Sequence, residues 1–487
     1  MKYRLIGLTA AVAGLIVACA ASTLAADNPT RRTHQHLEAR QPGQACSCDG
    51  SGLCTHLPLV LIETGGKKIP GDPILNEAGA EIGYTTADDN APMLDAHIRV
   101  IDNRESNNHS ADAPALESDT LIRIRGNSSR YYDKKSYLLR LTDDKGEYAD
   151  QEIMGMDAHY EWALYGPYMD KSLIRNYMWY NIAGEMMDYA PNVRFCEVVI
   201  DGKYQGLYLM AETLTSGEDC RLNLTDPLEG TDQTGFLLRL DRGSTTKIKN
   251  IKTFTNYTYR NLQAVDIKYP RSGKLTPGLV NAISQEFSDF EKSLYSYDYD
   301  TDNYGFWHYI DVDSFVDYFI INEFTANYDA GWLSTYIYKD VGGKYKMVIW
   351  DFNSACDNYQ HSVVQPQHLE LQMNVWYYML MKDEYFCRKI LRRYEELRTN
   401  YLSEAYLDTY IDDVVAYLGD AIDRNFAVWG YTFKTDMLKP AERNPKSYKE
   451  AVQSLKSFIT QRGAWLDRNL EIIKQYSHES KVKKFNH

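Results

Sequence analysis

Several common catalytic signatures are missing from this 487-residue sequence. It has no Gly-x-Ser-x-Gly nucleophile elbow, no His-Glu-x-x-His zinc motif and no lone cysteine near a matched histidine. It also lacks an internal repeat. Local motifs therefore give no support to a serine esterase, a zinc protease or a cysteine-dependent enzyme.

Basic residues are also scarce. The chain has 53 Lys and Arg against 67 Asp and Glu, a net charge of −14. A protein that binds nucleic acid in general needs a basic surface to match the phosphate backbone, so we expect no nucleic-acid partner. A few basic groups gathered at one place could still hold a nucleotide. The 44% of hydrophobic residues can support a large core.

Residues 5–18 form an apolar run without charge, which follows a positively charged start and is too short for a membrane span. We expect 1–18 to be a signal peptide. The sequence at 16–19 resembles a lipobox, which would place a lipid anchor on Cys19, whereas 24–26 offers an ordinary cleavage site. Either ending predicts export, as a membrane-anchored lipoprotein at the cell surface or as a secreted protein.

The cysteines give little information about function. Cys46, Cys48 and Cys54 form a tight group in a segment rich in Gly, Ser and Asp. A zinc site normally draws on two paired sets of ligands, and only one set is visible here. We therefore expect a local disulfide or exposed thiols.

The hydrophobic pattern predicts an α+β protein with a β-rich first part and a mainly helical second part. Residues 19–55 are polar and predict a flexible tether, 56–210 a β-rich N-terminal lobe, and 211–487 a mainly helical C-terminal lobe that contains one hairpin. Strands are predicted at 57–62, 95–101, 120–125, 135–141, 195–200 and 206–210. Helices are predicted at 171–187, from 313 to just before 329, and at 384–402, 407–426 and 448–473. Residues 216–256, rich in Thr, Gly and Asp, predict exposed loops.

The hairpin lies between two aspartates. Residues 335–341 and 345–350 are rich in β-branched and aromatic side chains, and Gly342-Gly343 supplies a tight turn. Asp329 stands before the first strand and Asp351 after the second. Because a hairpin returns the chain beside its start, the two carboxylates should lie close together.

Two neighbouring carboxylates fit more than one chemistry. In phosphoryl transfer one acid orients the acceptor hydroxyl and the other holds a metal on the nucleotide phosphates. Glycosidases also use an acid pair, at separations that a sequence does not reveal. Acids beside a hairpin can equally well be ordinary surface residues.

A second pattern favours phosphate binding. A strand ends at Arg125 and enters the small polar loop 126–129, which can offer backbone N–H and hydroxyl donors to phosphates. Lys134 and Lys135 follow at the start of the next strand. Neighbouring strand residues face opposite ways, so at most one of these lysines points into a cleft.

With these stretches together, the chain resembles the CotH-type (spore coat protein H) atypical protein kinase family. The resemblance covers roughly residues 57–360 and rests on an ordered series of stretches: RGNSS with KKSYLLRL, YGPYMDKSLIRNYMWYNIAGEM, VVIDGKYQGLYLMAET, GFLLRLD, NEFTANYDAGWLSTYIYKD and MVIWDFN.

The resemblance implies a two-lobed kinase-like fold and transfer of the γ-phosphate of ATP, with Mg²⁺ or Mn²⁺, to Ser or Thr hydroxyls of a protein substrate. It implies that Asp329 is the catalytic aspartate and that Asp351 and Asn353 bind the metal. Nucleotide-binding roles fall on Arg125, Asn127, Ser128, Lys135 (with Lys134 as its competitor), Arg175 and Glu212.

Two of these assignments have a structural alternative. Asp170, Arg175 and Asn176 match the pattern Asp-x-Ser-x-x-Arg-Asn that opens a helix, where they could orient the loop and phosphates or simply form an N-cap and a buried arginine pair. Glu212 could contact adenine at a hinge or form a structural ion pair.

Two positions depart from the family pattern. Ser334 stands five residues after Asp329, where a metal-binding asparagine is usual, and Asn353 replaces the aspartate of Trp-Asp-Phe-Asp. An amide oxygen can still coordinate a metal. The alternative function is therefore a catalytically weak or dead kinase-fold surface protein that acts as a binding or scaffold module.

Overall fold

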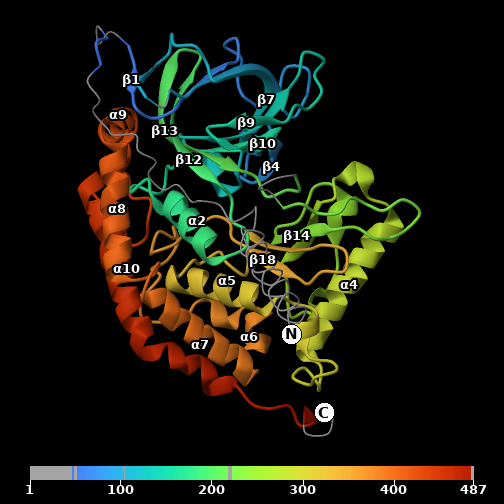
Figure 1. Ribbon diagram of the computed structural model, residues 1–487. Helices are drawn as coiled ribbons and strands as arrows, with labels where there is room; N and C mark the ends of the chain where they lie inside the picture. Colours follow the sequence, from blue (N-terminus) through green and yellow to red (C-terminus); the bar gives the residue numbers. More distant parts are fainter. Residues whose placement is uncertain (1–45, 49–51, 104, 218–221, 484–487) are drawn as a thin grey trace, which may run out of the picture.

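The computed structural model describes residues 46–48, 52–103, 105–217 and 222–483 (Figure 1). The expected signal peptide, Cys19 with its lipid anchor, and residues 19–45 of the expected tether lie outside the described residues. None of the helices in the described part is both long and apolar enough to span a membrane. Strands dominate the first half and helices the second, which confirms the mixed composition predicted from the sequence.

The first half folds into a closed β-barrel. Its strands follow one another around the barrel as β11 (Glu161–Tyr165), β13 (Lys203–Glu212), β12 (Val193–Ile200), β2 (Leu59–Glu63), β5 (Leu94–Ile101), β7 (Leu116–Arg125) and β8 (Ser136–Thr142). Side chains alternate in burial along β7, as expected for a strand with one face toward a core. Val60, Ile98, Ile122, Leu139 and Trp162 are among the residues that fill the barrel.

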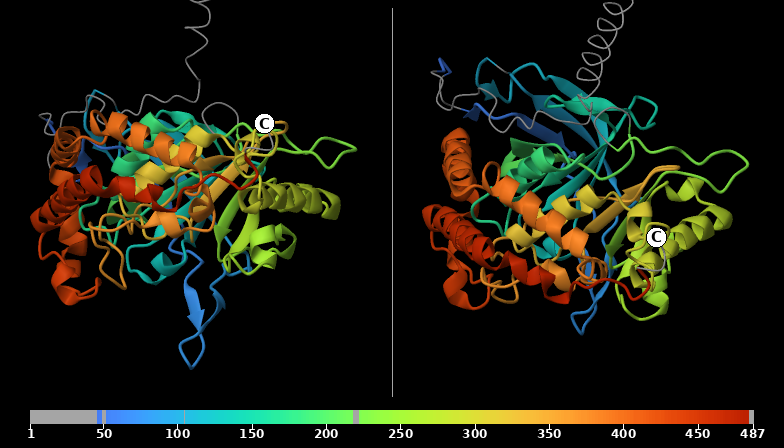
Figure 2. Two further views of the ribbon diagram at one scale, coloured as in Figure 1. Left: turned by 90° about the horizontal axis from the view of Figure 1, so that it is seen from below. Right: turned by 60° about the horizontal axis from the view of Figure 1, so that its bottom comes forward.

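Short strand pairs surround the barrel. β1 (Cys54–Thr55) pairs with β6 (Asn108–His109), and β9 (Gln151–Ile153) pairs with β10 (Met156–His159). β3 (Pro73–Leu75) and β4 (Glu81–Tyr84) form a hairpin that projects from the molecule (Figure 2).

A second sheet lies in the C-terminal half and carries the predicted hairpin. Its order is β15 (Asn250–Ile251), β16 (Ala264–Tyr269), β14 (Phe236–Asp241), β17 (Thr335–Lys339) and β18 (Lys346–Val348). The prediction of exposed loops across 216–256 is wrong at β14, a largely buried strand at the centre of this sheet. Its apolar run Phe236-Leu237-Leu238 explains the burial.

Helices pack around this sheet and below the barrel (Figure 1). They are α2 (Arg175–Met186), α3 (Phe254–Tyr257), α4 (Pro277–Tyr295), α5 (Val312–Phe324), α6 (Tyr377–Leu380), α7 (Glu384–Arg398), α8 (Glu404–Leu418), α9 (Asp420–Trp429) and α10 (Tyr448–Asn469). α2 lies between the barrel and α5, and apart from Glu185 all its residues are buried. Its polar side chains must therefore find partners inside the protein.

Three predicted helix boundaries are corrected. The helix expected at 407–426 is two helices, because Gly419 between them adopts a left-handed backbone with φ of 46°. α5 is capped by Asp311, whose side chain accepts a hydrogen bond from the Ser314 N–H. α2 begins at Arg175 rather than at 171, after a turn that starts at Asp170.

Candidate functional site

The hairpin brings its two aspartates together, as the sequence predicts. α5 ends at Phe324, Asp329 lies in the loop that follows, and Asp351 comes just after β18. β17 and β18 pair in antiparallel register. The two carboxylates lie close enough that the charge of Asp329 raises the pKa of Asp351.

Asp351 sits on a strained but well-supported backbone. Its φ is 61°, a left-handed conformation that is uncommon for residues other than glycine. Its N–H donates to the Tyr180 hydroxyl at 3.0 Å, and its carbonyl accepts from Asn327 Nδ2 at 3.2 Å. The next N–H, of Phe352, donates to Asn176 Oδ1 at 2.7 Å. Such strain persists only where surrounding contacts hold it, and it is typical of functional sites.

The pKa of the Asp351 carboxyl is raised to about 6. Burial is the main cause and the neighbouring charge of Asp329 the second, while Arg125 acts in the opposite direction. The Arg125 guanidinium lies over the Trp350 ring, 5.4 Å from its centroid. The barrel strand β7 therefore ends with a positive charge directed at this acid, in the place where the sequence suggested a phosphate contact.

Further oxygen atoms surround Asp329. Burial raises its pKa, and a hydrogen bond from Ser354 acts against that rise. Ser354 Oγ lies 3.1 Å from Asp329 Oδ2 and 2.9 Å from Asn353 Oδ1, so its single proton can serve only one of them at a time. Carboxylate, amide and hydroxyl oxygens are the donors that Mg²⁺ and Mn²⁺ prefer. The donor set fits a hard divalent metal.

α2 holds the segment that follows Asp351. Asp170 accepts hydrogen bonds from the Arg175 N–H at 2.8 Å and from Arg175 Nη1 at 2.6 Å. Arg175 also donates to the carbonyls of Ala355 at 2.9 Å and Cys356 at 3.2 Å. Both charged side chains are buried. The buried arginine pair is therefore present and positions the loop after Asp351, as each alternative left by the sequence expects in part, whereas α2 begins without a side-chain cap. A contact of Arg175 with phosphate stays a prediction.

The small polar loop after β7 reaches β14. With its amide turned so that the oxygen faces the guanidinium, Asn127 accepts from Arg242 Nη1 at 2.9 Å and Nε at 3.0 Å. Ser128 opens a short 3₁₀ turn, Ser128–Tyr131. Arg130 donates to the carbonyls of Gly126 and Gly71, both at 2.6 Å, which anchors this loop at its base.

Sequence reasoning missed Asp241 and Arg242, at the end of β14. Arg242 lowers the pKa of Asp329, and Asp241 raises the pKa of both Asp329 and Asp351. A third acid and a second arginine therefore take part in the electrostatics of the pair. For Asp241 the signal was the polar end of the apolar strand GFLLRLD, and Arg242 is the next residue. Nothing in the sequence places either residue beside the hairpin.

The two candidate lysines face opposite ways, as predicted, although both precede β8 rather than lying on it. Lys135 forms an ion pair with Asp72 at 2.9 Å and donates to the Arg130 carbonyl at 2.5 Å. Lys134 is buried and donates to the Leu207 carbonyl at 2.6 Å and to Asn425 Oδ1 at 2.7 Å. Its pKa is lowered well below the usual value because burial disfavours the charge. Lys134 thus joins the barrel to α9.

Glu212 is held by hydrogen bonds inside the protein, and Ser334 has a strained backbone. Glu212 is fully buried at the end of β13, where it accepts from the Asn192 N–H at 2.9 Å and from Asn192 Nδ2 at 3.3 Å. Ser334 has a φ of 49°, a second strained position in the loop between the acids. A contact of Glu212 with adenine stays a prediction.

Cavity volume does not locate the site. A pocket of about 590 Å³ lies in the C-terminal half, and its lining includes Asp311, Asp313 and Asp383 but neither Asp329 nor Asp351. The acid pair is distinguished instead by its charges, its strained backbone and its buried frame.

Comparison with known proteins identifies the family of the chain. A family model described as CotH kinase protein matches residues 122–466, from within β7 to within α10, and so includes both acids. No curated protein matches the chain. The matched range covers most of the sequence, and it confirms the resemblance inferred from the motifs. The chain belongs to the CotH kinase protein family.

Proposed function

We propose that this protein transfers the γ-phosphate of ATP to Ser or Thr hydroxyls of a protein substrate, with Mg²⁺ or Mn²⁺. The observation that carries the proposal is the acid pair Asp329 and Asp351, which interact electrostatically and lie on a buried frame in a chain of the CotH kinase family. On this proposal the barrel is the N-terminal lobe and the remainder the C-terminal lobe of a kinase-like fold.

Asp351 would hold the divalent metal, with the amide oxygen of Asn353 as a second ligand. The raised pKa of Asp351 reflects two carboxylates brought together in a buried place, and a cation there would offset their repulsion. When bound, the metal supplies the positive charge that neutralises the phosphate oxygens during transfer.

Asp329 would orient the acceptor hydroxyl and take up its proton. A carboxylate with a raised pKa is a stronger base than an ordinary exposed aspartate. The hydrogen bond from Ser354 Oγ to Asp329 Oδ2 leaves Oδ1 available for a substrate hydroxyl.

Arg125 and Arg242 would neutralise further phosphate charge from the barrel side and from β14. Lys135 remains a candidate for the same task, but it would have to exchange its partner Asp72 for a phosphate. Asn127 and Ser128 would contact the nucleotide from the small polar loop 126–129, which follows β7.

We further propose that the protein is exported with 1–18 as its signal peptide, and that it is anchored through a lipid on Cys19 or is secreted. Its protein substrate would then be met outside the cytoplasm, where ATP is scarce. Three routes remain: nucleotide supplied locally, a different phosphoryl donor, or function without catalysis.

The test is incorporation of phosphate from γ-labelled ATP into the chain itself or into a generic acceptor protein, with Mg²⁺ or Mn²⁺. Removing the metal ligand in Asp351→Ala should abolish labelling, and Asp329→Asn should lower it by about 10²–10⁴-fold. Asp313→Ala is the matched control, because Asp313 is an exposed carboxylate paired with Lys389, and it should label like the native protein.

Ser334 and Asn353 favour the second candidate function, a kinase-fold scaffold without catalysis. Ser334 places a weaker hydroxyl ligand where an asparagine is usual, and Asn353 has one negative charge less than the usual aspartate. Metal-dependent nucleotide binding without labelling would support that function and contradict phosphate transfer. Labelling that survives in Asp351→Ala would contradict the assignment of this residue.

A further inference from the structure

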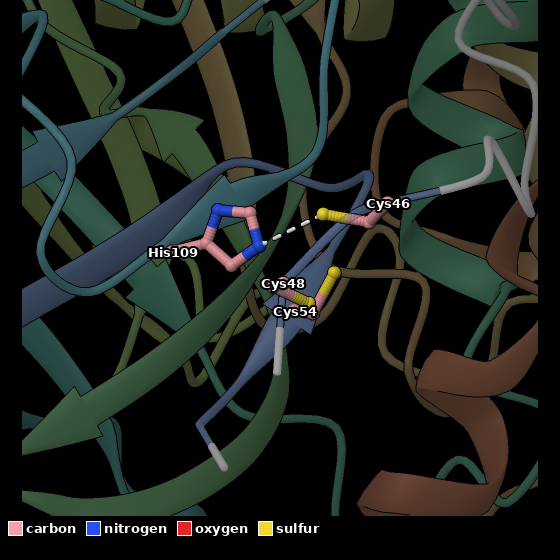
Figure 3. Close-up of side chains that lie close together, drawn as sticks. All are labelled: Cys46, Cys48, Cys54 and His109. Atoms are coloured by element: carbon pink, nitrogen blue, oxygen red, sulfur yellow. Dashed lines mark hydrogen bonds between the residues drawn. The ribbon is translucent and has the colours of Figure 1, made fainter. Parts of the chain in front are cut away.

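Three cysteines and a histidine converge at the N-terminal edge of the barrel, far along the sequence from the acid pair. The ligand atoms of Cys46, Cys48, Cys54 and His109 all lie within 4.8 Å of one another (Figure 3). Tetrahedral zinc with bonds of about 2.3 Å to sulfur needs neighbouring ligand atoms about 3.8 Å apart. The observed grouping is close to that requirement.

The fold fixes two of these ligands directly. β1 and β6 pair in antiparallel register, with Cys54 opposite His109. Asn108, beside His109, donates its Nδ2 to the Leu57 carbonyl at 2.8 Å and is fully buried, which anchors the ladder to the barrel. Cys46 Sγ lies 3.3 Å from His109 Nε2, which places a third ligand beside the ladder.

Neighbouring side chains orient the ligands as they do in metal sites. Asp112 Oδ2 lies 3.2 Å from His109 Nδ1 and accepts from the His109 N–H at 2.9 Å. Asn103 Nδ2 donates to the same oxygen at 3.0 Å. A carboxylate on Nδ1 keeps the proton there and leaves Nε2 with its lone pair toward the sulfurs, an arrangement found behind most zinc-binding histidines.

A hydrogen-bond donor also faces one of the sulfurs. Asn107 Nδ2 donates to Cys54 Sγ at 3.2 Å. An N–H group directed at sulfur stabilises the thiolate, which is the form that binds metal.

The grouping does not suit a disulfide. Among the described residues, no disulfide joins these three cysteines, and Cys196, Cys356 and Cys387 are buried elsewhere. A disulfide within the group would use two sulfurs and leave the third, with His109, unexplained. Of the expected local disulfide or exposed thiols, the thiols are found, since Cys46 and Cys48 are exposed thiols. His109 was not foreseen as their neighbour because it lies 55 residues beyond Cys54 and reaches it through the β1–β6 ladder.

We propose that Cys46, Cys48, Cys54 and His109 bind one Zn²⁺ as a closed structural site. Four protein ligands leave no open position, so the metal has a structural and not a catalytic role. Just after Cys54, Thr55 Oγ1 accepts from Arg424 of α9 at 3.2 Å, and His56 Nε2 lies 2.5 Å from the Tyr417 carbonyl of α8. The zinc would therefore fasten the incoming chain where the barrel meets the C-terminal helices.

The test is the zinc content of the full protein, purified without chelators and measured by plasma mass spectrometry. We expect one zinc per chain, lost in Cys46→Ser, Cys48→Ser and His109→Gln. His97→Gln is the matched control, because His97 pairs with Asp119 and Glu117 and with no cysteine; it should keep its zinc. Far-ultraviolet circular dichroism of each variant separates loss of metal from loss of the fold.

Two further measurements identify the ligands without depending on the folding of a cysteine variant. Cobalt substituted for zinc should show thiolate charge-transfer bands and the intense d–d bands of a tetrahedral ion. Asp112→Asn, which keeps all four ligands, should weaken zinc binding by about 10–100-fold.

Three results would overturn the proposal. The first is a metal-free protein that takes up no zinc when zinc is supplied. The second is a native disulfide between any two of the three cysteines, seen as a mass loss of the non-reduced peptide. The third is full zinc content in the cysteine and His109 variants.

Discussion

The acid pair and the thiol cluster are two proposed metal sites built in opposite ways. The acid site collects hard oxygen donors from a single hairpin, Asp329 to Ser354, and its half-buried side chains lie on a segment that α2 holds. The thiol cluster collects soft donors from two distant segments at an exposed edge. Donor chemistry is the reason for proposing Mg²⁺ or Mn²⁺ at the first and Zn²⁺ at the second.

The two sites also differ in how they are held. The backbone of Asp351 is held by hydrogen bonds to Tyr180 of α2 and to Asn327. The thiol cluster stands on the short β1–β6 ladder, and its side chains are more exposed. A preformed buried frame suits a metal that comes and goes with a nucleotide, whereas a weakly framed cluster relies on its metal for structure.

The largest expected effect comes from breaking the frame of the acid site. Arg175→Met would leave Asp170 charged and buried without its partner, so the free energy of unfolding in urea should fall by about 3–5 kcal/mol. Arg388→Met is the control, because it removes an exposed pair with Glu384 and should cost about 1 kcal/mol at most. If Arg175→Met lowered the free energy of unfolding no more than the control does, the buried ion pair would not stabilise the acid site. The proposed difference in how the two sites are held would then be wrong.

A smaller effect tests the electrostatic cost of the acid pair. In metal-free buffer at pH 7.5, Asp351→Asn should raise the free energy of unfolding by about 2–3 kcal/mol, because it removes a buried charge whose pKa rises from 3.8 to about 6 on folding. As the pH rises from about 4 to 6, ionisation of the Asp351 carboxyl lowers the free energy of unfolding of the native protein. The extra stability of the variant should therefore shrink as the pH falls from about 6 to 4.

The test is how the difference in the free energy of unfolding between Asp351→Asn and the native protein changes with pH. A difference at a single pH does not identify its cause. Asparagine also tolerates a φ of 61° better than aspartate does, and that contribution does not change with pH. Thermal melts of both proteins between pH 4 and 7.5 separate the two. A constant difference across this range would show that the charge of Asp351 has no cost.

The smallest effect concerns the number of charged donors. Asn353→Asp restores the carboxylate usual in the family, and the added negative charge should lower the Mg²⁺ concentration for half-maximal nucleotide binding by up to about tenfold. Asn400→Asp adds the same charge at an exposed position after α7 and should leave the Mg²⁺ requirement unchanged. Equal shifts in the two variants would show that position 353 does not face the metal.

How much the sequence could predict depends on how local each feature is. The hairpin and its two acids were predictable because strands, turn and aspartates lie within one stretch. Arg242 and His109 were not assigned roles, because each meets its site through strand pairing across a large separation in sequence.

Burial was equally hard to foresee. Lys134 and Lys135 stand side by side in a polar stretch, yet only Lys134 is buried, against Leu207 and Asn425. Its partner Asn425 lies 291 residues away. No local pattern distinguishes a lysine that joins the barrel to α9 from one that stays beside Asp72.

The central claim is that the acid pair binds Mg²⁺ or Mn²⁺ and the thiol cluster binds Zn²⁺, because their donor atoms differ. It is tested most directly by crystals grown with Mn²⁺ and a non-hydrolysable ATP analogue, with anomalous data collected at the manganese and zinc absorption edges. We predict a manganese peak beside Asp351 and Asn353, against the phosphates, and a separate zinc peak among Cys46, Cys48, Cys54 and His109. Manganese absent from Asp351 in a nucleotide-bound crystal, or zinc at the acid pair with none at the cysteines, would contradict the account.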